Sequence, residues 1–168
     1  MKKNITLIGM PGAGKSTTGI ILAKNLSMGF LDTDILIQIN RGESLQSIMD
    51  RDGYMALRQI EEEEILKINI EGHVIATGGS AVYSEAAMKH LGTISRIIFL
   101  QAGLAELKAR IRNFETRGIA KAGNQSFAEL FSEREVLYRR YADIVVDTAF
   151  VSQDETALLL EKKLKELD

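Results

Sequence analysis

Residues 9–16, GMPGAGKS, have the composition and spacing of a loop that binds phosphate groups. They match the pattern G-x-x-x-x-G-K-S and stand between a short apolar run at 5–8 and a helix-spaced segment at 16–26. Glycines let the backbone curl so that successive N–H groups point inward, and the following helix adds the positive end of its dipole. This context argues against the alternative, a glycine-rich turn that carries a lysine by chance.

The side chains of this loop suit a nucleotide polyphosphate with a bound Mg²⁺ ion. Lys15 can reach the β- and γ-phosphates, Ser16 can offer its hydroxyl to Mg²⁺, and Thr17 can add a hydrogen bond to phosphate. The predicted nucleotide-binding residues of the loop are Gly9, Gly12, Ala13, Gly14, Lys15, Ser16 and Thr17.

Two acidic residues lie two positions apart in the stretch FLDTD, residues 30–34, where a second apolar run ends. If this run is a strand beside the phosphate loop, Asp32 and Asp34 project to the same face and can both point into the cleft above the sheet. One could then serve the metal and the other the molecule that accepts the phosphate. The alternative is that Thr33 or Asp34 caps the helix that follows, and for Asp34 both interpretations stay open.

The elements that would position these residues alternate along the chain. Strands are predicted at 5–8, 73–77, 96–100 and 143–147, in addition to the run that ends at Asp32. Helical patterns occupy 16–26, 44–70, 103–111, 126–139 and 154–167. We therefore expect an α/β protein with the three-layer P-loop NTPase fold, in which helices cover both faces of a five-stranded parallel sheet.

Composition limits the possible partners. The chain has 168 residues, a net charge of −2 and no massed basic patch, so nucleic acid is not an expected partner. It contains no cysteine, which excludes disulfides and thiolate chemistry. No apolar run approaches the length of a membrane span. We expect one domain over residues 1–168, monomeric, soluble and cytoplasmic.

A phosphate loop alone does not distinguish a GTPase from a small-molecule kinase. A guanine-specific protein should carry N-K-x-D late in the chain, and this sequence has none. DRDG at 50–53 imitates a GTPase motif but follows a helical pattern, so we interpret it as a turn between helices. The polar stretch 112–125 lacks a period and is long for a connection, which is typical of a lid.

Several short motifs together resemble the shikimate kinase family. They are LDTD after the phosphate loop, GESLQSI at 42–48, GYMALRQIE at 53–61, VIATGG at 74–79, an arginine at 117 and REVLY at 134–138. The match runs over nearly the whole chain in order. The resemblance implies ATP-dependent transfer of the γ-phosphate to a hydroxyl of shikimate, a step of aromatic amino acid biosynthesis, with Mg²⁺ as cofactor.

The resemblance also implies a role for each matching residue. Asp34 would accept the proton of the substrate hydroxyl, Asp32 would help Ser16 to order Mg²⁺, and Arg117 would swing over the β- and γ-phosphates. The implied catalytic residues are Asp34, Lys15 and Arg117, and the implied substrate-binding residues are Asp34, Arg58, Glu61, Gly78, Gly79 and Arg134. The substrate-binding segment would span about 33–61 and the lid about 112–125.

Each assignment has a purely structural alternative. Arg58 and Glu61 are also spaced as an i, i+3 helix ion pair, although by resemblance Glu61 would orient Arg58 toward the substrate carboxylate. Gly78 and Gly79 could form a plain strand-to-helix turn, and Arg117 could be a solvated loop charge. Arg110 resembles the residue that stacks on adenine, but it could equally be a cation at a helix C-terminus.

The sequence departs from the family pattern at the acceptor side. The family usually has a third glycine where this chain has Ser80, and its lid usually continues with Pro-Leu-Leu where this chain has Gly118, Ile119 and Ala120. These changes leave open another small hydroxy acid, such as homoserine, whose ammonium group would need an acceptor like Glu61 or Ser80. A protein that binds nucleotide without catalysing transfer is the alternative from a second class.

Overall fold

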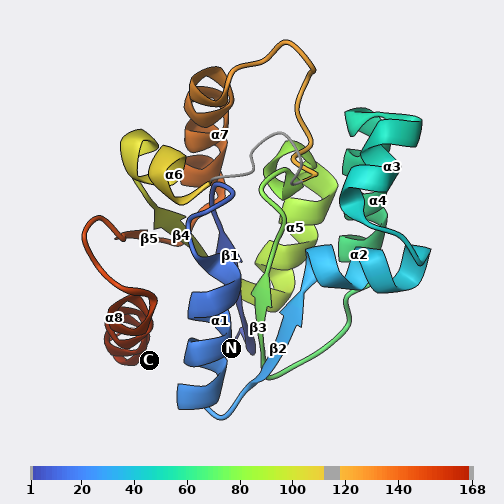
Figure 1. The fold of residues 1–168 in the computed structure, drawn as a ribbon. Helices are drawn as coiled ribbons and strands as arrows, with labels where there is room; N and C mark the ends of the chain where they lie inside the picture. The colour runs from blue at the N-terminus through green and yellow to red at the C-terminus, as the bar shows by residue number, and fades with distance from the viewer. Residues whose placement is uncertain (1, 112–117, 167–168) are drawn as a thin grey trace.

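Five parallel strands form one sheet in the order β2-β3-β1-β4-β5. The computed structural model in Figure 1 describes residues 2–111 and 118–166. The strands are β1 (Asn4–Ile8), β2 (Gly29–Asp32), β3 (His73–Ala76), β4 (Ser95–Gln101) and β5 (Ile144–Asp147). The central strand β1 is buried along its whole length because both its edges are paired and helices cover both its faces. The predicted α/β class is confirmed.

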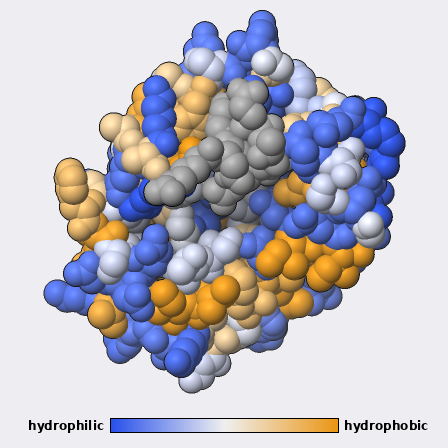
Figure 2. All heavy atoms as spheres, in the orientation of Figure 1, coloured by the Kyte–Doolittle hydropathy of each residue, from blue (hydrophilic) through white to orange (hydrophobic). Residues whose placement is uncertain are grey.

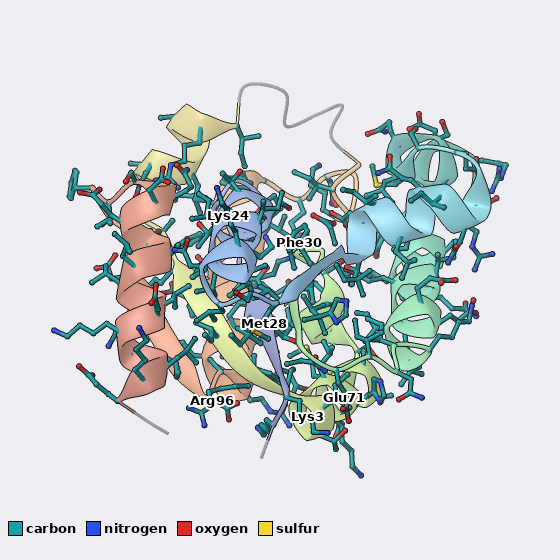
Figure 3. The ribbon with its side chains drawn as sticks, turned by 90° about the horizontal axis from the view of Figure 1, so that it is seen from below. Lys3, Lys24, Met28, Phe30, Glu71 and Arg96 are labelled. Atoms are coloured by element: carbon teal, nitrogen blue, oxygen red, sulfur yellow. The ribbon has the colours of Figure 1, made fainter. Side chains whose placement is uncertain are left out.

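Helices connect the strands and make the outer layers. They are α1 (Lys15–Asn25), α2 (Thr33–Arg41), α3 (Leu45–Asp52), α4 (Tyr54–Leu66), α5 (Glu85–Ile94), α6 (Leu104–Arg110), α7 (Phe127–Tyr141) and α8 (Gln153–Lys165), with a short 3₁₀ turn η1 (Ala81–Tyr83) before α5. Figures 1 and 3 show α1 and α8 side by side on one face of the sheet, with α5 and α7 on the other. The helical pattern at 44–70 is divided at Gly53, whose φ of 84° ends α3. The predicted break between two helices is therefore present, but it is confined to Gly53, because residues 50–52 still belong to α3.

Two apolar clusters hold these layers. The main cluster lies around the sheet, and a smaller one joins the segment α2-α3-α4. The smaller cluster consists of Ile37, Leu45, Ile48, Leu57 and Ala120. Because Ala120 lies within the predicted lid, about 112–125, this cluster ties the described part of that loop to the segment predicted to bind substrate. The opposite side of α2 leaves Ile35 and Ile39 exposed, where Figure 2 shows apolar surface.

Packing between β2 and α1 sets the position of the first acidic residue. The ring of Phe30 lies against Gly19, where a Cβ atom would come within 2.7 Å of the ring, and Figure 3 shows Phe30 beside α1. Since side chains two apart on a strand share a face, Asp32 points toward α1 as well. It meets Ser16, one helical turn before Gly19. The contact that brings α1 close to β2 therefore also places an acid beside the phosphate loop.

No helix in residues 2–111 and 118–166 is long and apolar enough to cross a membrane.

Candidate active site

A cavity of about 360 Å³ lies where the phosphate loop meets α2, α4 and the loop after β3. The predicted site residues that line it are Gly12, Gly14, Lys15, Ser16, Thr17, Asp34, Glu61, Gly78, Gly79, Arg110 and Arg134. Gly9, Ala13, Asp32 and Arg58 do not line this cavity, and Arg117 lies outside the described residues. Both predicted halves of the site, for nucleotide and for acceptor, thus open into one space.

The phosphate loop has the geometry of an anion site. Gly14 has a φ of 90°, a left-handed conformation that a residue with a side chain adopts only with strain, and α1 begins directly after it without a side-chain cap. Lys15 is 8% exposed, and its Nζ donates to the carbonyls of Gly9 at 2.8 Å and Met10 at 2.9 Å. The loop therefore holds a buried ammonium group at the start of a helix, and both features favour negative charge.

Asp32 and Asp34 belong to different elements, because β2 ends at Asp32 and α2 begins at Thr33. Asp32 caps α2: its Oδ1 accepts from the N–H groups of Asp34 at 3.0 Å and Ile35 at 3.3 Å. Its Oδ2 accepts from the Ser16 hydroxyl at 2.5 Å. The alternative in which Thr33 or Asp34 is the cap is wrong, and so is the expectation that both acids point from one strand face. Asp34 instead enters the cavity from the first turn of α2.

Glu61 is a buried carboxyl group that shares the cavity with Asp34. Its side chain is 3% exposed, its Oε2 accepts from the Ser80 hydroxyl, and its Oε1 has no hydrogen-bond partner in the described structure. A Cβ atom on Gly78 would lie 2.1 Å from Glu61 Oε1 and 2.6 Å from Asp34 Oδ1, so the two acids flank the same glycine. Burial, and then the charge of Asp34, raise the pKa of Glu61 to about 7.

The second glycine of this turn is equally constrained. A Cβ atom on Gly79 would lie 2.7 Å from Arg134 Nη1 and 2.9 Å from Pro11 Cδ, in the phosphate loop. The Gly79 carbonyl accepts from the buried Tyr138 hydroxyl at 2.6 Å. The turn therefore passes between the phosphate loop and α7 with no room for a side chain, which supports the prediction of a close backbone approach.

Arg58 and Arg134 converge on one oxygen atom. The carbonyl of Ala120 accepts from Arg58 Nη2 at 3.3 Å and from Arg134 Nη2 at 2.7 Å. In the described chain no carboxylate lies within ion-pair distance of either guanidinium group, and each leaves its Nε buried without a hydrogen bond. The i, i+3 ion pair between Arg58 and Glu61 is absent because Glu61 turns to Ser80 instead. Arg58 lines a neighbouring cavity of about 610 Å³ together with Ser80 and Tyr83.

Arg110 lies at the nucleotide side of the cavity. It ends α6, pairs with Glu106 one turn earlier, and its Nη1 is 3.4 Å from the carbonyl of Gly12 in the phosphate loop. Arg110 is therefore both a cation at a helix C-terminus and a residue that lines the cavity. Its other predicted role, stacking on adenine, stays a prediction.

Three contacts around Arg58 and Glu61 could not be predicted from local patterns. The Ala120 carbonyl lies in a polar, aperiodic stretch, and the hydrogen bond from Ser80 to Glu61 joins residues 19 apart. Tyr83 is the third: the guanidinium carbons of Arg58 and Arg134 lie 3.6 and 5.4 Å from its ring centroid. Of these three contacts, only that of Tyr83 had a sequence feature that could have suggested it, an aromatic residue shortly after Gly78 and Gly79.

Comparison with known proteins gives a consistent result. The family model described as shikimate kinase matches residues 11–165. A shikimate kinase of Thiobacillus denitrificans is 37% identical over 151 residues, which cover 88% of this chain and 82% of that protein. The structure of shikimate kinase from Acinetobacter baumannii in complex with shikimate superposes with a TM-score of 0.92 at 25% identity, covering 99% of this chain and 94% of the other. That of shikimate kinase from Aquifex aeolicus gives 0.83 at 27% identity and 96% coverage of both chains.

Proposed function

Because this chain belongs to the shikimate kinase family, we propose that it transfers the γ-phosphate of ATP to a hydroxyl group of shikimate. The observation that carries the proposal is the joint opening of two differently built sites into one cavity. One end is a phosphate loop with a buried lysine, and the other holds a carboxylate beside a glycine turn and a buried arginine.

The nucleotide side fits ATP with Mg²⁺. Mg²⁺ keeps several water ligands in kinases and needs only one or two protein oxygen atoms besides the phosphates. The Ser16 hydroxyl, at the start of α1, and Asp32 Oδ2, at the end of β2, are 2.5 Å apart and supply such a pair. No group of three or more histidine or acidic residues in the described chain could enclose a metal ion, which fits an ion held mainly by phosphate and water. Bound Mg²⁺ would neutralise charge that develops on the phosphates.

The acceptor side fits a molecule with a carboxylate and a hydroxyl group. Two guanidinium groups directed at one oxygen atom can bind a carboxylate by paired hydrogen bonds, and here they meet at the Ala120 carbonyl. We propose that the substrate carboxylate binds Arg58 and Arg134 and displaces this contact. Asp34 and Glu61, beside Gly78, would then face the hydroxyl groups of the substrate.

In the proposed transfer, a substrate hydroxyl oxygen attacks the γ-phosphorus in line with the bond to the β,γ-bridging oxygen. The new P–O bond forms as that bond breaks, and ADP leaves with the bonding electron pair. Asp34 takes the hydroxyl proton, and the Lys15 ammonium group stabilises the negative charge on the β- and γ-phosphates during the transfer. Glu61 is less suited to be the base, because its pKa of about 7 leaves it partly protonated near neutral pH. Arg117 is proposed to join the phosphates from the lid.

The lid is proposed to span about 112–125, and its described part is anchored to α3. The Gly118 N–H donates to Gln46 Oε1 at 2.8 Å, and Ile119 and Ala120 are buried. This anchor holds the described part of the lid beside the cavity. We propose that the lid closes over the substrate and excludes water, which is a competing acceptor. We propose that the protein acts as a monomer in the cytoplasm.

The test is ADP release, coupled to NADH oxidation, with Mg·ATP and either shikimate or L-homoserine. The proposal expects turnover with shikimate. Turnover with homoserine alone would mean that the scaffold kept its base and changed its acceptor. If neither acceptor supports turnover and the wild type is no more active than Asp34→Asn, the result would favour a protein that binds nucleotide without transfer.

A variant of the carboxylate site makes the same assay more specific. Arg58→Ala should raise the KM for shikimate by about 10- to 100-fold, because it removes a charged hydrogen bond to the carboxylate. The KM for ATP should stay close to that of the wild type. An unchanged KM for shikimate would contradict the role of Arg58.

A further inference from the structure

One aromatic ring lies within cation–π distance of both arginines of the acceptor site. Tyr83 ends η1, directly after the glycine turn, and its ring centroid is 3.6 Å from the guanidinium carbon of Arg58 and 5.4 Å from that of Arg134. Its hydroxyl donates to Glu133 on α7, which also accepts from Gln125 Nε2 at 3.2 Å. The Tyr83 side chain is thus held by its hydroxyl group, which binds Glu133, and by its ring, which contacts the two arginines.

The two arginines benefit from such a contact because no carboxylate of the described chain forms an ion pair with either of them. They are like charges held at one carbonyl oxygen, and each has a buried Nε without a hydrogen-bond partner. Burial, together with the charge of Arg134, lowers the pKa of Arg58, whereas Tyr83 and Tyr54 oppose this change. Tyr54, one turn before Arg58 on α4, is 5.0 Å from the guanidinium carbon and supports it from a second direction.

The choice of an aromatic ring in place of a carboxylate has a consequence for binding. A carboxylate beside Arg58 would stabilise the positive charge but would also neutralise it and compete with an incoming anion. The face of an aromatic ring attracts a cation electrostatically and leaves its charge and its N–H groups to a ligand. Glu61, the acid closest to Arg58 along α4, is turned away by its hydrogen bond to Ser80.

We propose that Tyr83 is a positioning residue for the acceptor: its ring holds Arg58 beside Arg134 with both charges kept for the substrate carboxylate. The proposal rests on the proposed function, since it assumes that these arginines bind that carboxylate. Tyr83 then contributes to affinity for carboxylate-bearing acceptors only, and it contributes nothing to the binding of ATP.

The test compares Tyr83→Leu and Tyr83→Met with Tyr83→Phe. Tyr83→Leu and Tyr83→Met remove the aromatic face and keep an apolar side chain. Two such variants are made so that the test can still be run if one of them does not fold. The third keeps the ring and loses the hydroxyl. Tyr141→Leu is the matched control, because Tyr141 is stacked on Arg140, 5.4 Å from its ring centroid, away from the cavity.

The measurement is the dissociation constant by calorimetry for three ligands: shikimate, the neutral methyl ester of shikimate, and ATP. Tyr83→Leu and Tyr83→Met should weaken shikimate binding by about 5- to 30-fold, as the loss of a desolvated cation–π contact implies. They should leave the constants for the methyl ester and for ATP within about twofold of the wild type, and Tyr83→Phe should recover most of the shikimate affinity.

Three outcomes would overturn the proposal. One is wild-type affinity for shikimate in both apolar variants, and another is an equal loss of affinity for the acid and its ester, which would indicate general damage to the pocket. The third is a loss in Tyr83→Phe as large as in Tyr83→Leu. If Arg58→Ala weakens shikimate binding while the Tyr83 variants do not, only the role of Tyr83 fails. If the wild type binds no shikimate, the proposed function fails with it.

Discussion

Replacing Glu61 by glutamine should stabilise the folded protein at neutral and alkaline pH. In the folded state burial and the neighbouring Asp34 raise the pKa of Glu61 from 4.5 to about 7. A pKa displaced by one corresponds to about 1.4 kcal/mol, so the ionised carboxyl group lowers the free energy of unfolding by up to about 3 kcal/mol above pH 7. Glutamine does not ionise, can still accept from Ser80, and can donate toward Asp34.

The sign of the pH dependence follows from where each state binds the proton. Between pH 4.5 and 7 the folded wild type binds a proton that the unfolded chain has released, so its stability falls as the pH rises through this window. The difference in unfolding free energy, Glu61→Gln minus wild type, should therefore be smallest near pH 4.5 and reach a plateau above about pH 7.5. In a protein that also carries Asp34→Asn, the stability difference between Glu61→Gln and Glu61 should be smaller. The reason is that this substitution removes the Asp34 charge, which together with burial raises the pKa of Glu61.

The assay is urea unfolding followed by circular dichroism at several values between pH 4.5 and 8.5. Glu63→Gln is the matched control, because Glu63 is an exposed glutamate on the same helix whose partner is Arg41. The control should differ from the wild type by less than about 1 kcal/mol, without the same rise. A difference for Glu61→Gln that is independent of pH, or that grows toward acid, would refute the reasoning.

Three further substitutions test the transfer machinery. Lys15→Met should abolish ADP release, because it removes the buried ammonium group of the phosphate loop, and residual turnover above one per cent of wild type would contradict its role. Asp34→Asn should lower kcat by about 10² to 10⁴-fold with little change in the KM for ATP, as expected for the loss of a general base. Gly79→Ala should inactivate the protein, since the new Cβ would lie 2.9 Å from Pro11 Cδ in the phosphate loop and would displace Arg134, whose Nη1 would be 2.7 Å away, whereas Gly92→Ala, with its nearest neighbour at 3.9 Å, should fold and act like the wild type.

Local signals predicted most of the fold. The phosphate loop, the strand before it and the helix after it depend on residues close together in the sequence, and they are confirmed. The split of residues 44–70 into two helices also followed from a local feature, the glycine at 53. Alternating strands and helices were enough to predict a parallel sheet, because such connections leave few topologies.

The acceptor side was harder to predict because its contacts join distant segments. The i, i+3 spacing of Arg58 and Glu61 was correctly noticed, yet a hydrogen bond from Ser80 decides where Glu61 points. The shared strand face expected for the two acids of FLDTD is absent, because β2 ends at Asp32, two residues before Asp34. Whether Ala120 is buried depends on the packing of a loop against α3, which no pattern within the loop records.

The position of β1 in the sheet affects how the protein can fold while it is synthesised. Residues 4–8 are made before their partners on both sides, which are residues 74–76 and 95–99. At ribosomal rates of about 5 to 20 residues per second, the first strand waits on the order of 5 to 20 seconds for its second neighbour. Throughout that interval the backbone N–H and C=O groups along the β4 edge of β1 are unpaired, and the nucleotide site proposed beside it is incomplete. We therefore expect ATP to protect the nascent chain from proteolysis only after β4 has been made.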